Sequence, residues 1–166
     1  MSQAHGLQPI VSKKSKVLIL GSLPGKESLR LGQYYAHPRN AFWPIMGVLF
    51  GAGPSFSYRK RVTLLRSTGI ALWDSLRACE RIGSLDSSIK DETANDFPRF
   101  FDMYPKITHI VFNGAKAEQV FRLYVLPALI EETFILARLP STSPAHARMP
   151  LNAKVQKWHV LRKFLS

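Results

Sequence analysis

Residues 17–43 read VLILGSLPGKESLRLGQYYAHPRNAFW, and the expected fold and the expected site both follow from this stretch. The short apolar run at 17–20 predicts a buried strand. Gly21, Pro24 and Gly25 then predict a tight, irregular loop at the carboxyl end of that strand, because Gly and Pro favour turns. Ligands of open parallel sheets bind at the carboxyl ends of the strands. The sequence therefore places a candidate binding loop directly after its first predicted strand.

Polar and aromatic side chains crowd the second half of this loop. Eight of them fall within eleven residues: Gln33, Tyr34, Tyr35, His37, Arg39, Asn40, Phe42 and Trp43. Amide, aromatic and guanidinium groups in this mixture suit recognition of a flat, polar ligand that can be stacked, such as a nucleobase. The alternative is an ordinary core, and we accept it from Trp43 onward, because the apolar residues there follow a helical stripe. Residues 33–40 carry too many polar groups for a core.

The length and composition are those of one ordinary globular domain. The chain has 166 residues, of which 46% are hydrophobic and 20% charged, so a single domain over 1–166 is expected. Its one cysteine, Cys79, excludes an internal disulfide and a multi-cysteine metal site. No apolar run approaches the ~18 residues of a membrane span, and residues 1–15 lack an apolar signal core. We therefore expect no metal, no cofactor, no membrane contact, and a monomer that acts in the cytoplasm, associated with the nucleoid.

Positive charge is concentrated in the two ends of the chain, and the net charge is +12. Residues 1–66 hold ten basic residues and one acid, residues 67–132 seven and ten, and residues 133–166 six and none. This split favours a DNA-binding surface, because charge that served only solubility would not leave the middle third acidic. Three basic segments should supply this surface: a loose arm at 1–15, the helix at 59–66 and the polar face of the last helix. Not all of them can face one duplex, because the last helix must bury its own apolar stripe. Their basic residues are Lys13, Lys14, Lys16, Arg59, Lys60, Arg61, Arg66, Lys154, Lys157, Arg162 and Lys163.

Alternating apolar runs predict a parallel sheet between helices. Strands are expected at 16–20, 70–73, 107–112 and 134–136. Helices are expected at 40–50, 57–67, 94–103, from 113 to about 126, and from Pro150 onward; a short helix and a loop at 83–86 should follow Asp74. Strands that alternate with helices favour parallel crossover connections. The predicted fold is therefore an α/β, three-layer α/β/α domain with a central, mostly parallel four-stranded sheet.

Four loops meet at one edge of the predicted sheet, because the carboxyl ends of parallel strands share an edge. The loops at 21–40, 74–86, 113–116 and 140–149 should bring together Asn40, Asp74, Asn113 and Ser141. Asp74 and Asn113 are equally explained as caps of the helices expected after them. The loops at 21–40 and 140–149, the two polar loops, hold a single carboxylate, Glu27. The two-carboxylate arrangement of ordinary glycosidases is therefore absent from them.

The same loops resemble the uracil-DNA glycosylase superfamily, especially its mismatch-specific and hypoxanthine-DNA glycosylase branches. Those proteins carry a G-x-x-P-G loop followed by H-P-x-N-x-F-W, which is matched here by Gly21, Pro24, Gly25, His37, Pro38, Asn40, Phe42 and Trp43. The sequence GSLPG at 21–25 followed by QYYAHPRN at 33–40 is most similar to the hypoxanthine branch. A second segment, 139–148, resembles the loop with which these enzymes enter the duplex.

This resemblance implies a monofunctional DNA glycosylase. Such an enzyme flips a deaminated base, hypoxanthine or uracil, out of duplex or single-stranded DNA and hydrolyses its N-glycosidic bond, which initiates base excision repair. Catalytic roles are implied for Asn40, Ser141 and Ser143. Base-binding roles are implied for Ser22, Leu23, Pro24, Gly25, Tyr34, Tyr35, Phe42, Asp74 and Asn113. DNA-binding roles are implied for His37, Arg39, Pro144, Ala145, His146 and Arg148.

Two positions depart from the family pattern. Many relatives place Asn or Asp where this chain has Leu23, to hold the attacking water, and Asn40 is the expected replacement. Ser141 stands where many relatives have His or Asn, and it is a weaker hydrogen-bond donor. Asp74 falls where relatives often have a base-reading Asn, and its carboxylate would accept from the N1–H of hypoxanthine or the N3–H of uracil.

Two other interpretations stay open from the sequence alone. Leu23 and Ser141 are also compatible with a weak or inactive relative that only binds nucleic acid. A small-molecule nucleoside hydrolase or transferase on the same fold is not excluded, because a fold does not determine a function. No lysine occupies a clear nucleophile position, and Lys116 is the one whose place near a strand end leaves a Schiff-base step conceivable.

Overall fold

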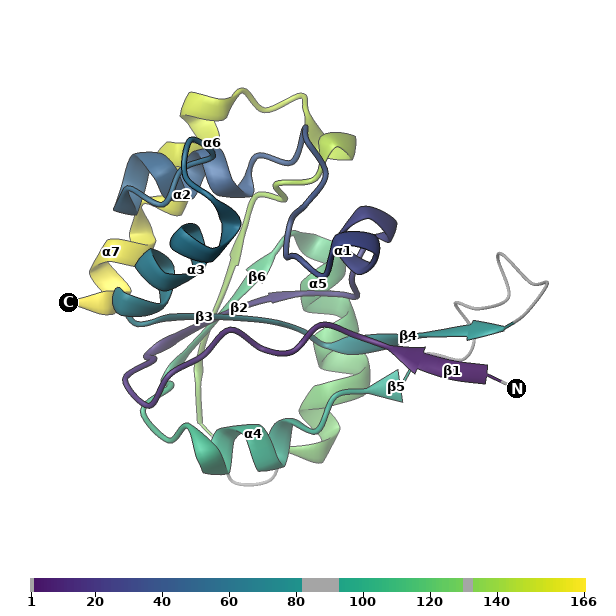
Figure 1. Ribbon diagram of the computed structural model, residues 1–166. Coiled ribbons are helices and arrows are strands. Elements are labelled where there is room, and N and C mark those ends of the chain that lie inside the picture. Colours follow the sequence, from purple (N-terminus) through teal and green to yellow (C-terminus); the bar gives the residue numbers. More distant parts are fainter. Residues whose placement is uncertain (1, 82–92, 130–132) are drawn as a thin grey trace.

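A central parallel sheet positions the other elements in the computed structural model, which describes residues 2–81, 93–129 and 133–166 (Figure 1). Its four strands lie in the order β3-β2-β6-β7. They are β2 (Val17–Gly21), β3 (Ile70–Asp74), β6 (His109–Asn113) and β7 (Ile135–Leu139). All three pairings are parallel. The expected four-stranded sheet is confirmed.

Helices cover both faces of this sheet, which completes the expected three layers (Figure 1). One face carries α2 (Phe42–Phe50), α3 (Tyr58–Ser67), α6 (Leu151–Trp158) and α7 (Val160–Leu165). The other face carries α4 (Phe97–Met103) and the continuous helical stretch of α5 (Ala115–Val120), η2 (Phe121–Val125) and η3 (Leu126–Ala128). Successive side chains of β2 alternate between these faces: Val17 and Ile19 join the first core, Leu18 and Leu20 the second.

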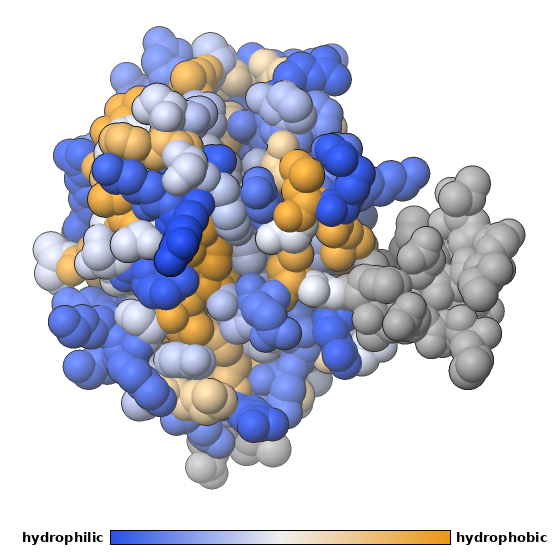
Figure 2. Space-filling model, viewed as in Figure 1, coloured by the Kyte–Doolittle hydropathy of each residue, from blue (hydrophilic) through white to orange (hydrophobic). Residues whose placement is uncertain are grey.

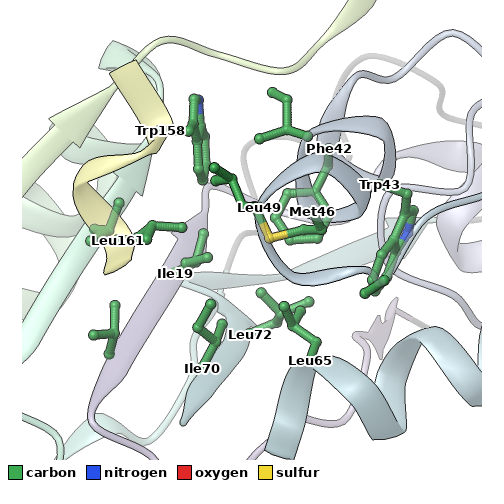
Figure 3. Packing of buried hydrophobic residues seen from close by; sticks show 14 of the residues in the cluster. Ile19, Phe42, Trp43, Met46, Leu49, Leu65, Ile70, Leu72, Trp158 and Leu161 are labelled. Atoms are coloured by element: carbon green, nitrogen blue, oxygen red, sulfur yellow. The ribbon is translucent and has the colours of Figure 1, made fainter. Parts of the chain in front are cut away.

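The first core connects directly to the loops at the edge of the sheet. Figure 3 shows Phe42 and Met46 of α2 among the sheet residues Ile19, Ile70 and Leu72 and the α6 residue Trp158. The indole N–H of Trp158 donates to the carbonyl of Pro140 at 2.9 Å, and that of Trp43 donates to the carbonyl of Tyr34 at 2.9 Å. Two buried indoles thereby fix one point in each of the two polar loops.

The amino-terminal segment belongs to the fold, and the prediction of a loose arm at 1–15 is wrong. Strand β1 (Ser2–His5) pairs antiparallel with β4 (Leu76–Arg81), which also pairs with the short β5 (Thr93–Ala94). Farther along, Ile10 exchanges two backbone hydrogen bonds with Leu72, of 2.9 and 2.8 Å, at the outer edge of β3. These pairings join backbone groups of segments that are distant in the sequence, and a local side-chain pattern does not predict them.

The region after Asp74 also differs from the prediction. The backbone N–H groups of Ser75 and Leu76 donate to the carbonyls of Gly21 and Ser22, at 3.0 and 2.9 Å. The chain therefore leaves β3 extended and enters β4 instead of the expected short helix, so Asp74 caps no helix. The loop expected at 83–86 lies outside the described residues.

Several of the basic residues assigned to a DNA-binding surface are used elsewhere. Lys13 donates to the carbonyl of Met103 at 2.6 Å and precedes the amino end of β2, at the opposite edge of the sheet from the polar loops. Arg162 donates to the carbonyl of Leu49 near the end of α2. Lys154 is only 3% exposed, and this burial lowers the pKa of its ammonium group. Lys13, Arg162 and Lys154 are therefore removed from the expected DNA-binding surface.

Two glycines with left-handed backbones differ in their surroundings, which gives a matched test of how tightly the polar loops pack. Gly114 has φ 95° at the start of α5, and a Cβ there would lie 2.8 Å from the Cβ of Ser141. Gly32 has φ 66° and no atom within 4 Å of that position. We expect Gly32→Ala to lose about 1 kcal/mol of stability from backbone strain alone. Gly114→Ala should lose clearly more, because the backbone near Ser141 must move. Urea unfolding of both variants measures this, and equal losses would show that the packing is loose.

Candidate active site

A cavity of about 460 Å³ opens at the carboxyl edge of the sheet, where the sequence places the ligand site. Gly21, Asp74 and Asn113, the last residues of three neighbouring strands, contribute to its wall. The rest of the lining comes mainly from residues 22–28, 34–37 and 141–146. The expected convergence of Asn40, Asp74, Asn113 and Ser141 is found, since all four line this one cavity.

Thr142 joins the elements around the cavity. Its carbonyl accepts from the backbone N–H of Ala41 at 2.9 Å, which connects the two polar loops. Its backbone N–H donates to the side-chain oxygen of Asn113, and its hydroxyl accepts from the Asn113 amide, both at 2.9 Å. Asn113, expected among the base-binding residues, therefore uses both ends of its amide to hold the loop. Thr142, 1% exposed, has a role that the sequence analysis missed, because a threonine between two serines gives no distinctive signal.

Asp74 is the buried carboxyl group of the cavity. It is 7% exposed, and burial raises its pKa from an ordinary 3.8 to about 7. Its backbone carbonyl accepts from the side chain of Asn95 at 2.7 Å. A Cβ on Gly21 would lie 2.5 Å from the carboxyl oxygen Oδ1. The carboxyl group therefore fits only because its neighbour across the strand pair has no side chain.

Tyr35 presents an aromatic ring to the cavity, supported from behind by Phe42. The two rings stack with centroids 4.0 Å apart, and Tyr35 holds a left-handed backbone with φ 54°, a strain typical of functional positions. Its hydroxyl is buried and has no hydrogen-bond partner within the described part of the chain. Burial and the nearby Asp74 charge raise the pKa of this hydroxyl, and the adjacent Asn113 side chain partly offsets them. Phe42 is fully buried and does not line the cavity, so the structure places it beneath the stacking ring.

Tyr34 lies beside the cavity but is committed to the protein. Its side chain is 4% exposed, its hydroxyl donates to the carbonyl of Gln8 at 2.9 Å, and its backbone N–H donates to the Tyr58 hydroxyl at 3.0 Å. Burial raises the pKa of the Tyr34 hydroxyl, and the charge of Asp74 adds to the effect. Tyr34 therefore shapes the wall, whereas Tyr35 is the more exposed of the two residues.

Asn40 lines the cavity with a side chain whose orientation is fixed. Its Oδ1 accepts from the backbone N–H of Phe42 at 2.9 Å, and its own backbone N–H donates to the His37 carbonyl at 2.9 Å. The oxygen thus accepts from the first residue of α2. The amide nitrogen has no hydrogen-bond partner among the described residues. A fixed amide of this kind can hold a water molecule without ionising.

The second loop orders itself through its serines. The Ser141 hydroxyl accepts from the N–H of Ser143 at 3.2 Å, and the Ser143 hydroxyl accepts from the N–H of Ala145 at 3.2 Å, which caps the short helix η4 (Pro144–His146). Both hydroxyls keep their own hydrogen for donation. Ser141, Ser143, Pro144 and His146 line the cavity, whereas Ala145 and Arg148 are exposed outside it.

The remaining predicted residues divide between the wall and the rim. Ser22, Leu23, Pro24, Gly25 and His37 line the cavity, while Arg39 is exposed outside it. Six further lining residues had no predicted role: Leu7, Lys26, Ser28, Ala36, Ala117 and Thr142. Lys116 also lines the cavity. Glu27 lies on the wall too, paired with Arg30 at 2.8 Å. A lysine or leucine at these positions carries no spacing signal that sequence reasoning could use.

Two features are absent from the described ranges. In them, no three His, Cys, Asp or Glu side chains gather as metal ligands. No helix there combines the length and apolarity needed to cross a membrane.

Replacing Asp74 should change stability in a pH-dependent way. Because the folded pKa of about 7 lies above the ordinary 3.8, the folded state binds this proton more tightly than the unfolded state. That stabilisation is complete below about pH 4 and is lost as the pH rises through 7. Asp74→Asn, which cannot ionise, should therefore unfold at a higher temperature than the parent near pH 8, with the gain vanishing near pH 4. The shift corresponds to at most about 4 kcal/mol. Thermal unfolding at the two pH values decides the matter, and a pH-independent difference would contradict the assigned burial of the charge.

Comparison with known proteins agrees with this geometry. The family described as the uracil DNA glycosylase superfamily matches residues 8–164. A hypoxanthine DNA glycosylase of Methanosarcina barkeri is 38% identical over 155 residues, covering 93% of this chain and 94% of that protein. A protein of the same name from Methanosarcina acetivorans is 38% identical over 158 residues, covering 95% and 96%. The solution NMR structure of a candidate uracil DNA glycosylase from Methanosarcina acetivorans superposes with a TM-score of 0.77 at 34% identity over the full length of both chains. The chain therefore belongs to the uracil DNA glycosylase superfamily and is a DNA N-glycosylase.

Proposed function

We propose that the protein is a monofunctional DNA glycosylase that receives a flipped hypoxanthine or uracil in its cavity and hydrolyses the N-glycosidic bond, which initiates base excision repair. The observation that carries the proposal is the cavity at the carboxyl edge of the sheet. Tyr35, Asp74 and Asn40 all line it. A flipped base requires an aromatic face on which to stack and polar groups for its edge. The names of the two Methanosarcina relatives favour hypoxanthine as the preferred base.

Base recognition is assigned to Tyr35, Asp74 and the 22–25 loop. The Tyr35 ring stacks on the base. With a pKa of about 7, Asp74 is present in both forms near neutral pH. Its ionised form accepts from the N1–H of hypoxanthine or the N3–H of uracil, and its protonated form donates to a base carbonyl. Backbone N–H groups at 22–25 are proposed to donate to the base oxygen.

Bond cleavage requires little acid–base chemistry from the protein, because a nucleobase is a good leaving group. The bond between the base nitrogen and C1′ breaks with its electron pair moving onto the base, where hydrogen-bond donors stabilise the charge. A water oxygen then bonds to C1′, and the proton that it loses neutralises the charge on the departing base through the solvent. Asn40 is proposed to hold this water. The hydroxyls of Ser141 and Ser143 are proposed to donate hydrogen bonds to the substrate from the opposite loop. Leu23 lines the cavity as well but cannot bind the water.

Removal of the Asn40 amide should abolish most of the chemistry. Asn40→Ala should lose on the order of a hundredfold or more in single-turnover rate, because the attacking water is no longer positioned. Affinity for the damaged duplex should change little. Since Oδ1 of Asn40 also accepts from Phe42, Asn40→Ser serves as the control: it keeps a capping oxygen and should recover stability but not rate. Normal cleavage by a folded Asn40→Ala protein would overturn the assignment.

The DNA-binding surface is assigned to the rim of the cavity. Lys26 and Lys116 line the mouth, and Arg39 and Arg148 are exposed beside it. The face seen in Figure 2 is mostly hydrophilic, with smaller apolar patches between the charged side chains. Lys13 and Lys14, at the far edge of the sheet, are excluded from this surface.

Salt dependence distinguishes the rim from the far edge. If about five phosphates are neutralised, log affinity should fall with log salt at a slope of about −4.5. The double variant Lys26→Ala with Lys116→Ala should reduce the slope to about −2.7. The matched control, Lys13→Ala with Lys14→Ala, should leave it unchanged. Fluorescence anisotropy over a salt series measures the slopes, and a slope near zero for the parent would favour a small-molecule substrate instead.

The segment 144–148 is proposed to enter the duplex when the base flips. It contains the helix η4, and Pro144 and His146 reach the cavity wall while Arg148 stays exposed. Flipping costs a few kcal/mol in a duplex and less in a single strand. His146→Ala with Arg148→Ala should therefore slow duplex substrates more than single-stranded ones. Cleavage rates on both forms measure the effect, and equal losses would count against a wedge.

One panel of substrates tests the function as a whole. Purified protein is incubated with uracil, hypoxanthine, xanthine or mismatched thymine in single- and double-stranded DNA, and abasic sites are counted. Release of hypoxanthine or uracil confirms the proposal. DNA binding without release points to an inactive relative, and cleavage of free nucleosides alone points to a small-molecule hydrolase. Borohydride trapping in the same reactions should fail, because both lining lysines, Lys26 and Lys116, are exposed and neither is desolvated as a nucleophilic lysine requires.

The assembly and the place of action are part of the proposal. We propose a monomer, because the residues assigned to base recognition and to the chemistry all belong to one chain. Action on nucleoid DNA in the cytoplasm follows from the proposed reaction. Sedimentation with and without a damaged duplex tests the first point, and a one-to-one complex is expected.

A further inference from the structure

The amino-terminal segment 6–10 is held against the cavity from two sides. The hydroxyl of Tyr34 donates to the carbonyl of Gln8 at 2.9 Å and lies 3.4 Å from that of Leu7. Ile10 is 6% exposed and exchanges two backbone hydrogen bonds with Leu72. The carbonyls that Tyr34 contacts therefore have a fixed place relative to the wall of the cavity.

Leu7 is one of the residues that line the cavity, as Tyr34, Tyr35 and Asp74 do. Its side chain packs against the core cluster that contains Tyr34, and its backbone carbonyl lies 3.4 Å from the Tyr34 hydroxyl. Leu7 therefore borders the same cavity as the Tyr35 ring and the Asp74 carboxyl group.

We propose that Leu7 is a specificity-determining residue of the base-recognition site and that its side chain contacts the bound base. This inference rests on the proposed glycosylase function. The region that matches the superfamily begins at residue 8, so Leu7 lies outside it. Its place in the wall follows from the structure, in which backbone pairing brings the chain terminus to the site.

An apolar side chain in the wall does what the polar wall residues cannot do. It makes no hydrogen bond, and it excludes water from the part of the cavity that it borders. A bicyclic purine extends farther from its glycosidic nitrogen than a pyrimidine does. Leu7 should therefore contact hypoxanthine more extensively than uracil, and the ratio of the two rates should depend on it.

The experiment compares Leu7→Ala with Leu7→Met and with Gln8→Ala. Gln8 is exposed, does not line the cavity and contacts Tyr34 only through its backbone carbonyl, so its side chain provides a neighbouring control. Single-turnover release of hypoxanthine and of uracil from matched duplexes is measured for each protein. The hypoxanthine-to-uracil ratio should fall about tenfold in Leu7→Ala, the range expected for lost apolar contact in a pocket. It should stay within about twofold of the parent in Leu7→Met, which preserves the volume, and be unchanged in Gln8→Ala.

Leu7 also packs on the core, so folding is checked by urea unfolding. If Leu7→Ala does not fold, Leu7→Val replaces it, and the ratio should fall in the same direction by a smaller factor. A folded variant with the parental ratio, even if both rates drop, overturns the role of Leu7 and leaves the proposed function intact. A parent protein that releases neither base overturns both.

Discussion

The site depends on one close approach between two strands. Gly21 and Asp74 are register partners at the ends of β2 and β3, and the absent side chain of Gly21 is what gives the Asp74 carboxyl group its place, with Oδ1 only 2.5 Å from where a Cβ would stand. The parallel pairing brings the two residues to the same edge of the sheet, and the following loops close over them. Burial then keeps the carboxyl group partly protonated near neutral pH. The chemistry assigned to the cavity thus follows from strand register and the size of one residue.

The loops around this carboxyl group are held by bonds to the core. The Thr142 carbonyl accepts from Ala41, the Asn113 amide holds Thr142 from the sheet, and two buried indoles, of Trp43 and Trp158, reach the carbonyls of Tyr34 and Pro140. Such support keeps a binding site in place before the ligand arrives, which reduces the reorganisation needed during the reaction. It also explains why a loop as irregular as 33–41 can present Tyr35 in a left-handed conformation.

The sequence predicted what local patterns encode. The alternation of strands and helices predicted the parallel sheet and its covering layers. The polar loop at 21–43 predicted the position of the site, and Asn40, Asp74 and Ser141 line one cavity there. It failed where distant backbone segments pair. β1, β4 and the exchange between Ile10 and Leu72 depend on hydrogen bonds that side-chain periodicity does not describe. For the same reason residues 1–15 were mistaken for a loose arm and Leu7 was missed. Base-binding roles were expected for both Tyr35 and Phe42, but Phe42 is fully buried and only Tyr35 lines the cavity, a difference that tertiary packing decides.

The central claim is that a flipped base lies between the Tyr35 ring and the Asp74 carboxyl group. The most direct measurement is a crystal structure of the Asn40→Ala protein bound to a duplex that contains a single hypoxanthine. The account predicts that the base is extrahelical, stacked on Tyr35, with its N1–H edge in hydrogen-bond contact with Asp74 and its C1′ beside the vacated amide position. A base that remains in the duplex over the rim, or one that enters the cavity with its N1 edge turned away from Asp74, would contradict it.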